Sequence, residues 1–322
     1  MRAIVCRELT GPSALRVENR EPSEPTDGEV KIAAHAWGVN FVDVLMTRGG
    51  YQLKPELPFV CGLEGAGEVL DVGRTVTEYR PGDRVIYGMR PGAFAEVVTV
   101  ASTSIIHAPA TLDWEQAACF RSAFVTAYHG LVQGGRLAAG EVALIHGATG
   151  GMGLAAVQVA KLLGATVIAT GGSEAKLDIV KQYGADHVVS YASPHFRETV
   201  RDLTGGADVV FDPVGGDIFD ESMRCLNWGA RIVVVGFTSG RAAEARTNHV
   251  LIKGASIVGV RAGEFARRNP EIGRKNLETV AEWAEAGKIQ SHISHRFPFE
   301  NVADAMTAIT NREVIGRAVL HR

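Results

Sequence analysis

A glycine-rich hexapeptide at residues 148–153, ATGGMG, is the part of this sequence whose composition points most directly to chemistry. It follows the pattern G-x-G-x-x-G with alanine at the first position, between an apolar run and an alanine-rich helical pattern. Gly150 would let the backbone approach a pyrophosphate, and Gly153 would let a helix pack closely on the preceding strand. The N–H groups at the helix N-terminus, with Gly151 and Met152, would face the phosphates. The pattern predicts a dinucleotide site; the alternative is a glycine loop used only for tight packing.

The residues that follow the next apolar run, 165–171, decide which dinucleotide fits. NAD sites usually carry an acid there, about 20 residues after the glycines, which binds the ribose hydroxyls. This chain instead continues with Gly172 and Ser173, and Lys176 follows one helical turn later. A hydroxyl and an ammonium without a carboxylate suit a 2′-phosphate, so the sequence favours NADPH over NADH. Two alternatives stay open: Glu174 as a ribose ligand rather than a complement to the helix dipole, and Ser173 as an N-cap only.

Three residues after later apolar runs are further candidates for cofactor contacts. Gly236 and Phe237 close the run RIVVVGF, and Arg261 follows the run SIVGV. Ligands of open α/β sheets gather at the carboxyl ends of the strands, so these residues would lie beside the cofactor. Arg261 would reach a carboxamide or a substrate carbonyl, or it is an ordinary surface charge.

Two kinds of pattern divide the chain into the elements that must position these residues. Up to about residue 120, short alternating or apolar runs are separated by Gly, Pro and Asp, which is typical of a β-rich barrel or rolled sheet. Beyond that point, Val- and Ile-rich runs alternate with amphipathic helical patterns, which indicates a parallel sheet covered on both faces. A long helical pattern and two further strands return to the first domain. We predict an α/β fold with one domain at 1–122 and 263–322 and another at 123–262.

The composition limits the classes of partner and location. The 322 residues carry a formal net charge of −3 and no basic run, so nothing favours nucleic acid as a partner. No window approaches the ~20 apolar residues of a membrane span, and no signal-peptide core opens the chain. Four widely separated cysteines are typical of reduced thiols in a cytoplasmic protein.

Several motifs in a fixed order carry a family resemblance: GVNFVDVLMTRGGY (38–51), LPFVCGLEGAGEVLDVG (57–73), PGDRVIYG (81–88), GAFAEVVTV (92–100), FVTAYHGL (124–131), HGATGGMG (146–153) and DVVFDPVGG (208–216). Over essentially the whole chain they resemble the medium-chain dehydrogenase/reductase superfamily, and within it the zinc-independent quinone oxidoreductases (the zeta-crystallin-like branch). The resemblance implies a GroES-like, β-rich catalytic domain, a Rossmann doubly wound domain that binds NADPH, and a homodimer. The apolar runs at 231–237 and 256–260 would form the edge that pairs across a twofold axis.

The resemblance also bears on catalytic metal. Zinc-dependent members carry a cysteine where this chain has Asn40 and a histidine where it has Leu63, and their third ligand aligns with Ser122. Leucine has no ligand atom and an amide is a poor ligand, whereas catalytic zinc needs about three protein ligands. Cys119, near the third position, is one thiol and cannot hold zinc alone. We predict no metal site, and without a Lewis acid to ionise an alcohol, hydride transfer to a conjugated acceptor is the easier reaction.

Three residues of the motif at 38–51 are the candidate catalytic residues, without a firm acid or base. Asn40 would hydrogen-bond the substrate oxygen or the nicotinamide ribose, and Asp43 would fix that amide or the ribose. Tyr51 would stack on a planar substrate or donate its phenol proton. Related reductases often have another tyrosine where this chain has Leu45, so the pocket is expected to be more apolar. The alternatives are a local backbone anchor for the Asn–Asp pair and a packing role for the tyrosine.

The family pattern also supplies cofactor contacts: Thr126 and Tyr128 beside the nicotinamide, and Tyr191 near the adenosine phosphate. The sequence thus predicts an NADPH-dependent reductase of a small-molecule quinone or conjugated enone. Two alternatives stay open. One is an enoyl-thioester or 2-enoate reductase, in which basic residues would line the pocket mouth (Arg48, Lys54 and Arg90). The other is a non-enzymatic, crystallin-like NADPH-binding protein.

Overall fold

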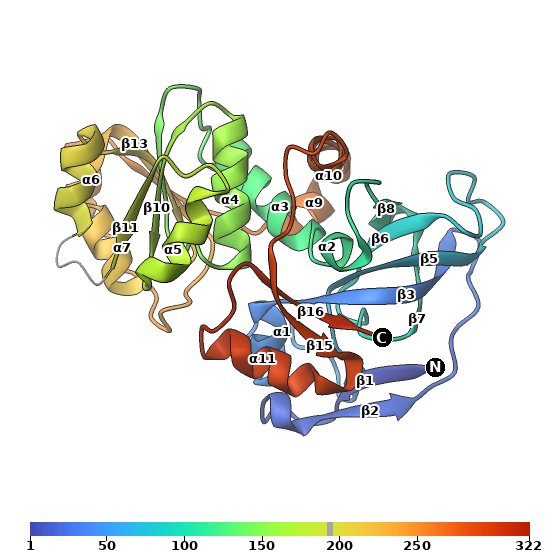
Figure 1. The fold of residues 1–322 in the computed structure, drawn as a ribbon. Coiled ribbons are helices and arrows are strands. Elements are labelled where there is room, and N and C mark those ends of the chain that lie inside the picture. The colour runs from blue at the N-terminus through green and yellow to red at the C-terminus, as the bar shows by residue number, and fades with distance from the viewer. Residues whose placement is uncertain (192–195) are drawn as a thin grey trace. The chain divides into compact units, whose positions relative to one another are not determined.

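The computed structural model describes residues 1–191 and 196–322 and divides into two compact units (Figure 1). Unit 1 combines Met1–Ser122 with Ala281–Arg322, and unit 2 is Ala123–Val280. The first division falls where the sequence changes from a β-rich to an alternating α/β pattern. Each unit has its own sheet and its own core, so each is described by itself.

The second division lies inside the long helix α10 (Pro270–Glu285) rather than at residue 263, where the sequence pattern placed it. Two contacts hold the intervening residues on unit 2. The ring of His129 stacks on Phe265 with centroids 4.1 Å apart. The side chains of Gln133 and Asn276 exchange hydrogen bonds of 3.0 and 3.2 Å. Such long-range contacts are absent from any local pattern, which explains the difference.

Unit 1 is built on two β-sheets. Its strands are β1 (Arg2–Cys6), β2 (Leu15–Asn19), β3 (Glu29–Val39), β4 (Phe59–Val60), β5 (Glu64–Val72), β6 (Arg84–Gly88), β7 (Val97–Ala101), β8 (Ile105–His107), β15 (Ile293–Pro298) and β16 (Arg317–His321). The larger sheet has the order β15-β16-β3-β5-β6-β8, with β7 also paired to β3, and the smaller has the order β2-β1-β4. Within the larger sheet only β15 and β16 are parallel neighbours. The strands from the end of the chain therefore complete a sheet begun near its start.

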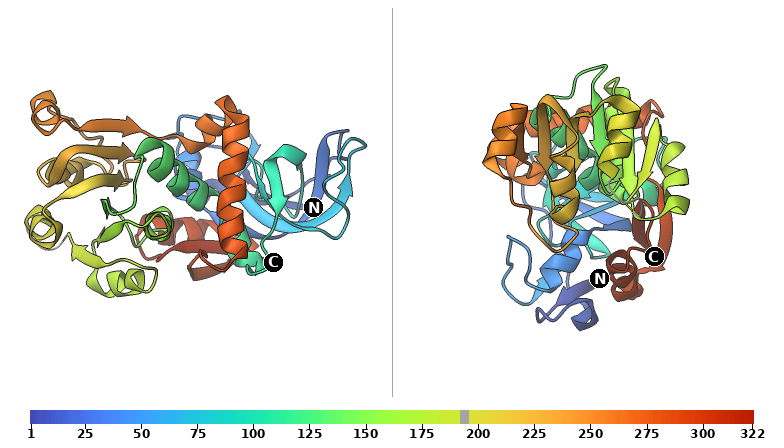
Figure 2. Two further views of the ribbon diagram at one scale, coloured as in Figure 1. Left: turned by 90° about the horizontal axis from the view of Figure 1, so that it is seen from above. Right: turned by 90° about the vertical axis from the view of Figure 1, so that its left-hand side faces the viewer.

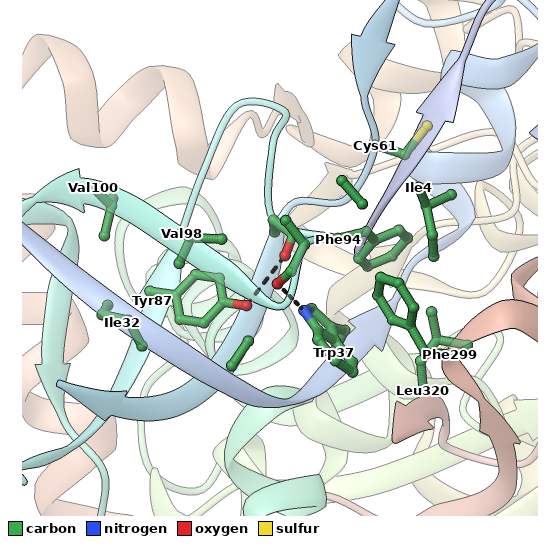
Figure 3. Packing of buried hydrophobic residues seen from close by; sticks show 14 of the residues in the cluster. Ile4, Ile32, Trp37, Cys61, Tyr87, Phe94, Val98, Val100, Phe299 and Leu320 are labelled. Carbon is green, nitrogen blue, oxygen red and sulfur yellow. Dashed lines mark hydrogen bonds between the residues drawn. The ribbon is translucent and has the colours of Figure 1, made fainter. Parts of the chain in front are cut away.

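The core of unit 1 lies against β3, whose side chains alternate between buried and half-buried up to Ala36, as expected of a strand with one face on the core. Figure 3 shows the two large rings at its centre. The indole of Trp37 donates to the carbonyl of Ala95 at 3.1 Å, and the hydroxyl of Tyr87 donates to the carbonyl of Ala93 at 3.2 Å. Because both polar ring atoms have partners, the core can bury these rings without leaving a polar group unsatisfied.

Short helices complete unit 1: α1 (Phe41–Thr47), α2 (Trp114–Ala118) and α11 (Val302–Thr310), with the 3-10 turns η1 (Pro12–Ala14), η2 (Ser102–Ser104) and η4 (Phe299–Asn301). The sequence patterns did not predict α1 and α2, because five to seven residues are too few for a clear amphipathic period. A local signal was nevertheless present for α2. The carboxylate of Asp113 accepts the N–H of Gln116 at 2.7 Å, a capping box written in the sequence as D-x-x-Q.

Unit 2 is a doubly wound α/β unit. Its six strands are β9 (Val142–Ile145), β10 (Thr166–Gly171), β11 (His187–Ser190), β12 (Ala207–Asp212), β13 (Leu226–Val234) and β14 (Ser256–Gly259). All neighbours are parallel, in the order β11-β10-β9-β12-β13-β14. Counted along the chain this is the order 3-2-1-4-5-6 of a Rossmann sheet, so the fold predicted from the sequence is confirmed.

Helices lie on both faces of this sheet (Figure 2). The helical segments that belong to unit 2 wholly or in most of their length are α3 (Arg121–Tyr128), the π-helical segment η3 (His129–Gly134), α4 (Gly151–Leu162), α5 (Glu174–Lys181), α6 (Phe196–Thr204), α7 (Gly216–Ser222), α8 (Thr247–Lys253), α9 (Ala262–Arg268) and α10. Because both faces are covered, all but one residue of each central strand is buried, which is why these strands read as nearly continuous apolar runs.

Candidate functional site

The turn between β9 and α4 is built on two glycines that the backbone requires. Gly147 has φ +57°, in the left-handed region, so the tight turn is made by this residue and not at Ala148, which the pattern aligned with the first glycine. Ala148 is buried, and its N–H donates to the carbonyl of Thr170 at 2.9 Å. A Cβ on Gly153 would lie 2.3 Å from the carbonyl oxygen of Gly147. Only glycine at 153 therefore lets the helix approach the turn this closely.

The N-terminus of α4 has the features of an anion site. Gly150 is the N-cap in an extended conformation, and Gly151 and Met152 are the half-buried first residues of the helix. The first N–H groups of a helix have no intrahelical acceptor and lie at the positive end of its dipole. A Cβ on Gly150 would meet nothing closer than 3.5 Å, so the fold alone does not require glycine there. The missing side chain instead leaves room for a phosphate group to reach the N–H groups.

The end of β10 carries no carboxylate before α5 begins. A Cβ on Gly172 would meet no atom within 4 Å, so the space beside it is open. Ser173 is the N-cap of α5, but its hydroxyl makes no capping hydrogen bond. Glu174 is exposed in the first turn of α5, where an acid complements the helix dipole, and Lys176 is half-buried one position before the buried Leu177. The residues after β10 therefore offer a hydroxyl and an ammonium group, with the carboxylate placed in the helix.

Of the other predicted cofactor residues of unit 2, all follow strand ends except Thr126 and Tyr128. Gly236 is half-buried and Phe237 exposed after β13, and Arg261 is exposed after β14 as the N-cap of α9. Thr126 and Tyr128, both half-buried, lie on α3 and not at a strand end. The carboxyl edge of the parallel sheet thus gathers the glycine turn, the end of β10 and these later residues, as open α/β sheets do for their ligands.

Tyr191, the residue directly after β11, has a more specific position than the sequence indicated. Its hydroxyl accepts the N–H of Gly147 at 2.9 Å and lies 2.8 Å from the hydroxyl of Thr170. The phenol therefore touches the backbone of the glycine turn itself.

Of the predicted catalytic residues of unit 1, Asn40 lies in a buried cluster around Arg317, a residue that the sequence patterns did not single out. The guanidinium of Arg317 donates to Oδ1 of Asn40 at 2.8 Å and to Oε1 of Glu64. The amide of Asn40 donates to the same carboxylate oxygen at 3.0 Å. The other oxygen of Glu64 accepts the N–H of Ser122 at 2.7 Å. All three side chains have relative exposures of 9% or less, so the cluster is closed to water.

The signal for Arg317 was present in the sequence, since it is a charged residue at the start of the otherwise apolar strand RAVLH. Its partner could not be found in the same way because Asn40 is 277 positions away. Gly38 shows how tightly the cluster is packed. A Cβ there would lie 3.0 Å from both Nη2 of Arg317 and Oε1 of Glu64.

Asp43 is also buried, and its hydrogen bond is the one expected of a local backbone anchor, the alternative given for the Asn–Asp pair. Its Oδ2 accepts the backbone N–H of Asn40 at 2.8 Å, which anchors the start of α1 and leaves the Asn40 amide to Glu64 and Arg317. Its Oδ1 is buried without a hydrogen-bond partner in the described part of the chain. Burial is the main cause that raises the pKa of Asp43 to about 7, and the nearby charge of Glu64 adds to it.

Tyr51 is half-buried and packs against the apolar core of unit 1. Cys119 is fully buried, and burial raises the pKa of its thiol to about 12, which makes it an inert side chain. Over residues 1–191 and 196–322, no three His, Cys, Asp or Glu side chains are grouped so that they could hold a metal ion. In the same residues, no helix has both the length and the apolar character needed to cross a membrane.

A surface pocket of about 340 Å³ lies elsewhere on unit 2 and contains none of the predicted site residues. It is lined by residues of α6, α8 and the segment after α7: Arg197, Arg201, Met223, Arg224, His249, Ile252 and Lys253. Most of these side chains are basic. They come from other elements than the glycine turn, which lies between β9 and α4. The pocket is therefore separate from the candidate cofactor site.

Comparisons with known proteins agree with this geometry. Residues 26–110 match the family model of the alcohol dehydrogenase GroES-like domain, and residues 151–283 match that of the zinc-binding dehydrogenases. The chain is 36% identical over 326 residues to the "quinone oxidoreductase-like protein 2 homolog" of Nematostella vectensis, covering 99% of this chain and 88% of that protein.

Two solved structures match the whole chain. One is an NAD-dependent alcohol dehydrogenase, with a TM-score of 0.92 and 31% identity over 100% of both chains. The other is the Escherichia coli quinone oxidoreductase complexed with NADPH, with a TM-score of 0.91 and 27% identity over 100% of both chains. A Rossmann unit in this setting supports a nicotinamide cofactor. On the relatives, the family models and the shared fold, this chain belongs to the medium-chain dehydrogenase/reductase superfamily.

Proposed function

We propose that the chain is an NADPH-dependent reductase that transfers hydride to a quinone or a conjugated enone without a catalytic metal. The name of the Nematostella relative and that of the Escherichia coli structure with NADPH support this acceptor and this cofactor. The NAD-dependent structure is about as similar to this chain, so the proposal of NADPH over NADH depends on this chain's own residues.

The end of β10 supports NADPH. An NAD site needs an acceptor for the ribose hydroxyls at this point, usually a carboxylate. Here Gly172 leaves open space, the hydroxyl of Ser173 makes no capping bond, and the exposed Glu174 lies beyond the strand in a helical turn. In our proposal Ser173 and Lys176 receive the 2′-phosphate, and the N–H groups of α4 receive the pyrophosphate.

The observation that carries the metal-free reaction is the guanidinium of Arg317 bound to both Asn40 and Glu64. A divalent cation placed among these groups would meet a buried positive charge and an amide whose oxygen is already hydrogen-bonded. The positions that hold zinc ligands in zinc-dependent relatives are here Asn40 and Leu63, and neither offers a thiolate or an imidazole.

Bound NADPH would supply the hydride, and the protein's residues would bind and orient the reactants. Asn40 acts as a positioning residue in this proposal, because its amide is held by Glu64 and Arg317. Tyr51 offers an aromatic face to a planar acceptor from its half-buried position. Reduction of a conjugated acceptor needs no prior removal of a hydroxyl proton, which suits a site without a strong base.

The test is loss of nicotinamide absorbance with NADPH or NADH and two acceptors, a para-quinone and a short enoyl-CoA, each measured with and without a chelator. We expect NADPH and the quinone to give the fastest turnover, unchanged by the chelator. Preference for the thioester would identify an enoyl-thioester reductase instead and direct attention to Arg48 and Lys54. Tight NADPH binding without turnover of either acceptor would favour the non-enzymatic alternative.

We also propose that the protein is a homodimer joined along β14, the edge strand of the sheet in unit 2. Large apolar side chains stand exposed on β13 and on α8, the helix that precedes β14 in the chain: Trp228 at 79%, Leu251 at 79% and Ile252 at 66%. An exposed strand edge flanked by apolar side chains is protected when a second copy pairs with it across a twofold axis. The four cysteines are buried free thiols, which suits the reducing cytoplasm that we propose as its location.

A further inference from the structure

The glycine turn is hydrogen-bonded to a series of polar side chains from four segments of unit 2: the end of β10, α7, and the residues directly after β9 and β11. His146, the residue directly after β9, lies with Nδ1 2.7 Å from Oγ1 of Thr170 and with Nε2 2.6 Å from Oγ of Ser222. All three side chains have a relative exposure of 0%. The hydroxyl of Tyr191 continues the series, since it lies 2.8 Å from Oγ1 of Thr170 and accepts the N–H of Gly147 at 2.9 Å. A continuous chain of hydrogen bonds thus joins α7 to the turn.

The short contacts favour one direction for each bond in this chain. The hydroxyl of Thr170 lies 2.7 Å from Nδ1 of His146, closer than the 3.3 Å to its alternative acceptor, the carbonyl of Ile145, and the hydrogen between the hydroxyls of Thr170 and Tyr191 can lie on either oxygen. The hydroxyl of Ser222 donates to the carbonyl of Ile218 at 2.7 Å, so its oxygen accepts from Nε2–H of His146. A neutral histidine with a proton on Nε2 has a bare Nδ1, which accepts from the hydroxyl of Thr170. With that hydrogen directed to Nδ1, the oxygen of Thr170 accepts from the hydroxyl of Tyr191, whose oxygen accepts from Gly147. In this arrangement each hydroxyl donates once and accepts once, so the chain is fully satisfied.

The aromatic packing around these groups fixes the rings in place. Phe196 meets the imidazole of His146 edge-on with centroids 5.5 Å apart, and it meets the ring of Tyr191 at 6.0 Å. The surroundings therefore favour one orientation of each ring. A neutral histidine agrees with them as well, because burial lowers the pKa of His146 to about 3.

We propose that this relay (Ser222, His146, Thr170 and Tyr191) positions the glycine turn so that α4 meets the cofactor's pyrophosphate. The proposal rests on the proposed function for the identity of the cofactor. Gly147 is the left-handed residue of the turn, and its carbonyl accepts the N–H of the N-cap residue Gly150 at 3.0 Å. Fixing the Gly147 peptide through Tyr191 therefore fixes the start of α4. A turn that is already in its bound shape loses less conformational freedom on binding.

The central test compares Thr170→Val, which has nearly the same shape but no hydroxyl, with Thr170→Ser, which keeps the hydroxyl. We expect Thr170→Val to bind NADPH about tenfold more weakly, because it leaves Nδ1 of His146 without a donor and the O–H of Tyr191 without its partner at Thr170. The KM for NADPH should rise while kcat at saturating NADPH stays unchanged. Thr170→Ser should bind NADPH like the original protein.

A second variant keeps the test independent of Thr170. Tyr191→Phe removes the acceptor of the Gly147 N–H, and Tyr183→Phe removes a phenol hydroxyl elsewhere in unit 2 as the matched control. Hydrogen exchange of the segment 146–150 without ligand should be faster in Tyr191→Phe and Thr170→Val and unchanged in Tyr183→Phe. This readout does not depend on which nucleotide binds.

The outcomes separate the two proposals. If no nicotinamide nucleotide binds the original protein, the proposed function fails, and faster exchange in the two variants still supports the relay. The relay is overturned if Thr170→Val exchanges and binds like the original protein, or if Thr170→Ser loses as much affinity as Thr170→Val. A nitrogen-15 spectrum that puts the His146 proton on Nδ1 would overturn the assigned directions.

Discussion

At the scale of single residues, two buried groups have pKa values shifted in opposite directions for one reason, since burial favours the uncharged form. Burial lowers the pKa of His146 to about 3 and raises that of Asp43 to about 7. Below about pH 6.5 the unfolded chain protonates His146 while the folded chain does not, so the free energy of unfolding decreases as the pH falls. Asp43 has the opposite sign: its contribution is complete below about pH 4 and is lost as the pH rises through 7.

The substitution Asp43→Asn tests this assignment. The amide is neutral at every pH, and its oxygen can still accept the N–H of Asn40. Between about pH 4 and 7, the free energy of unfolding of the original protein should fall relative to that of the variant by up to about 1.4 kcal/mol per pH unit. Urea denaturation at pH 5, 6 and 7 measures the difference, with the exposed Asp202→Asn as control. Parallel stability curves for Asp43→Asn and the original protein would contradict the raised pKa.

At the scale of elements, the close contact between the glycine turn and α4 depends on the absence of a Cβ atom at Gly153. Gly153→Ala would place a Cβ 2.3 Å from the carbonyl oxygen of Gly147, so the helix and the turn must separate. We expect a loss of about 1–3 kcal/mol of stability, as for overpacked cores, together with weaker NADPH binding by calorimetry. Gly263→Ala is the matched control, because its Cβ would have a flexible arginine tip at 3.6 Å as its nearest neighbour in the first turn of α9. Equal effects of the two substitutions would show that the close approach has no special importance.

The sequence predicted elements well where local pattern determines them. The apolar runs at 29–39 and 207–212 coincide with β3 and β12, and the glycine hexapeptide begins α4 as expected. Polar contacts across the fold were not predictable in this way. His146 meets Ser222 from 76 positions away, and Arg317 meets Asn40 from 277. Such pairs depend on which strands become neighbours, which no local window records.

At the scale of the whole molecule, the exposed apolar side chains of β13 and α8 predict its assembly. Light scattering should give twice the chain mass of 34.3 kDa for the original protein. The double substitution Trp228→Glu and Leu251→Glu should give the single-chain mass, because four charges would be desolvated across the twofold axis. Leu70→Glu, at a side chain 45% exposed in unit 1, should leave the mass unchanged. A single-chain mass for the original protein would refute the homodimer.

The place of Arg317 in β16 has a consequence for the order in which the molecule is completed during translation. Asn40 and Glu64 leave the ribosome long before the strand that carries their guanidinium partner. Unit 2 is continuous in sequence, so its parallel sheet can assemble while the sheet of unit 1 still lacks β15 and β16. Until those strands arrive, burying the carboxylate of Glu64 would leave a charge unpaired. A nascent chain halted before β16 is therefore expected to carry a folded unit 2 and an unfinished unit 1, and to depend on chaperones for that interval.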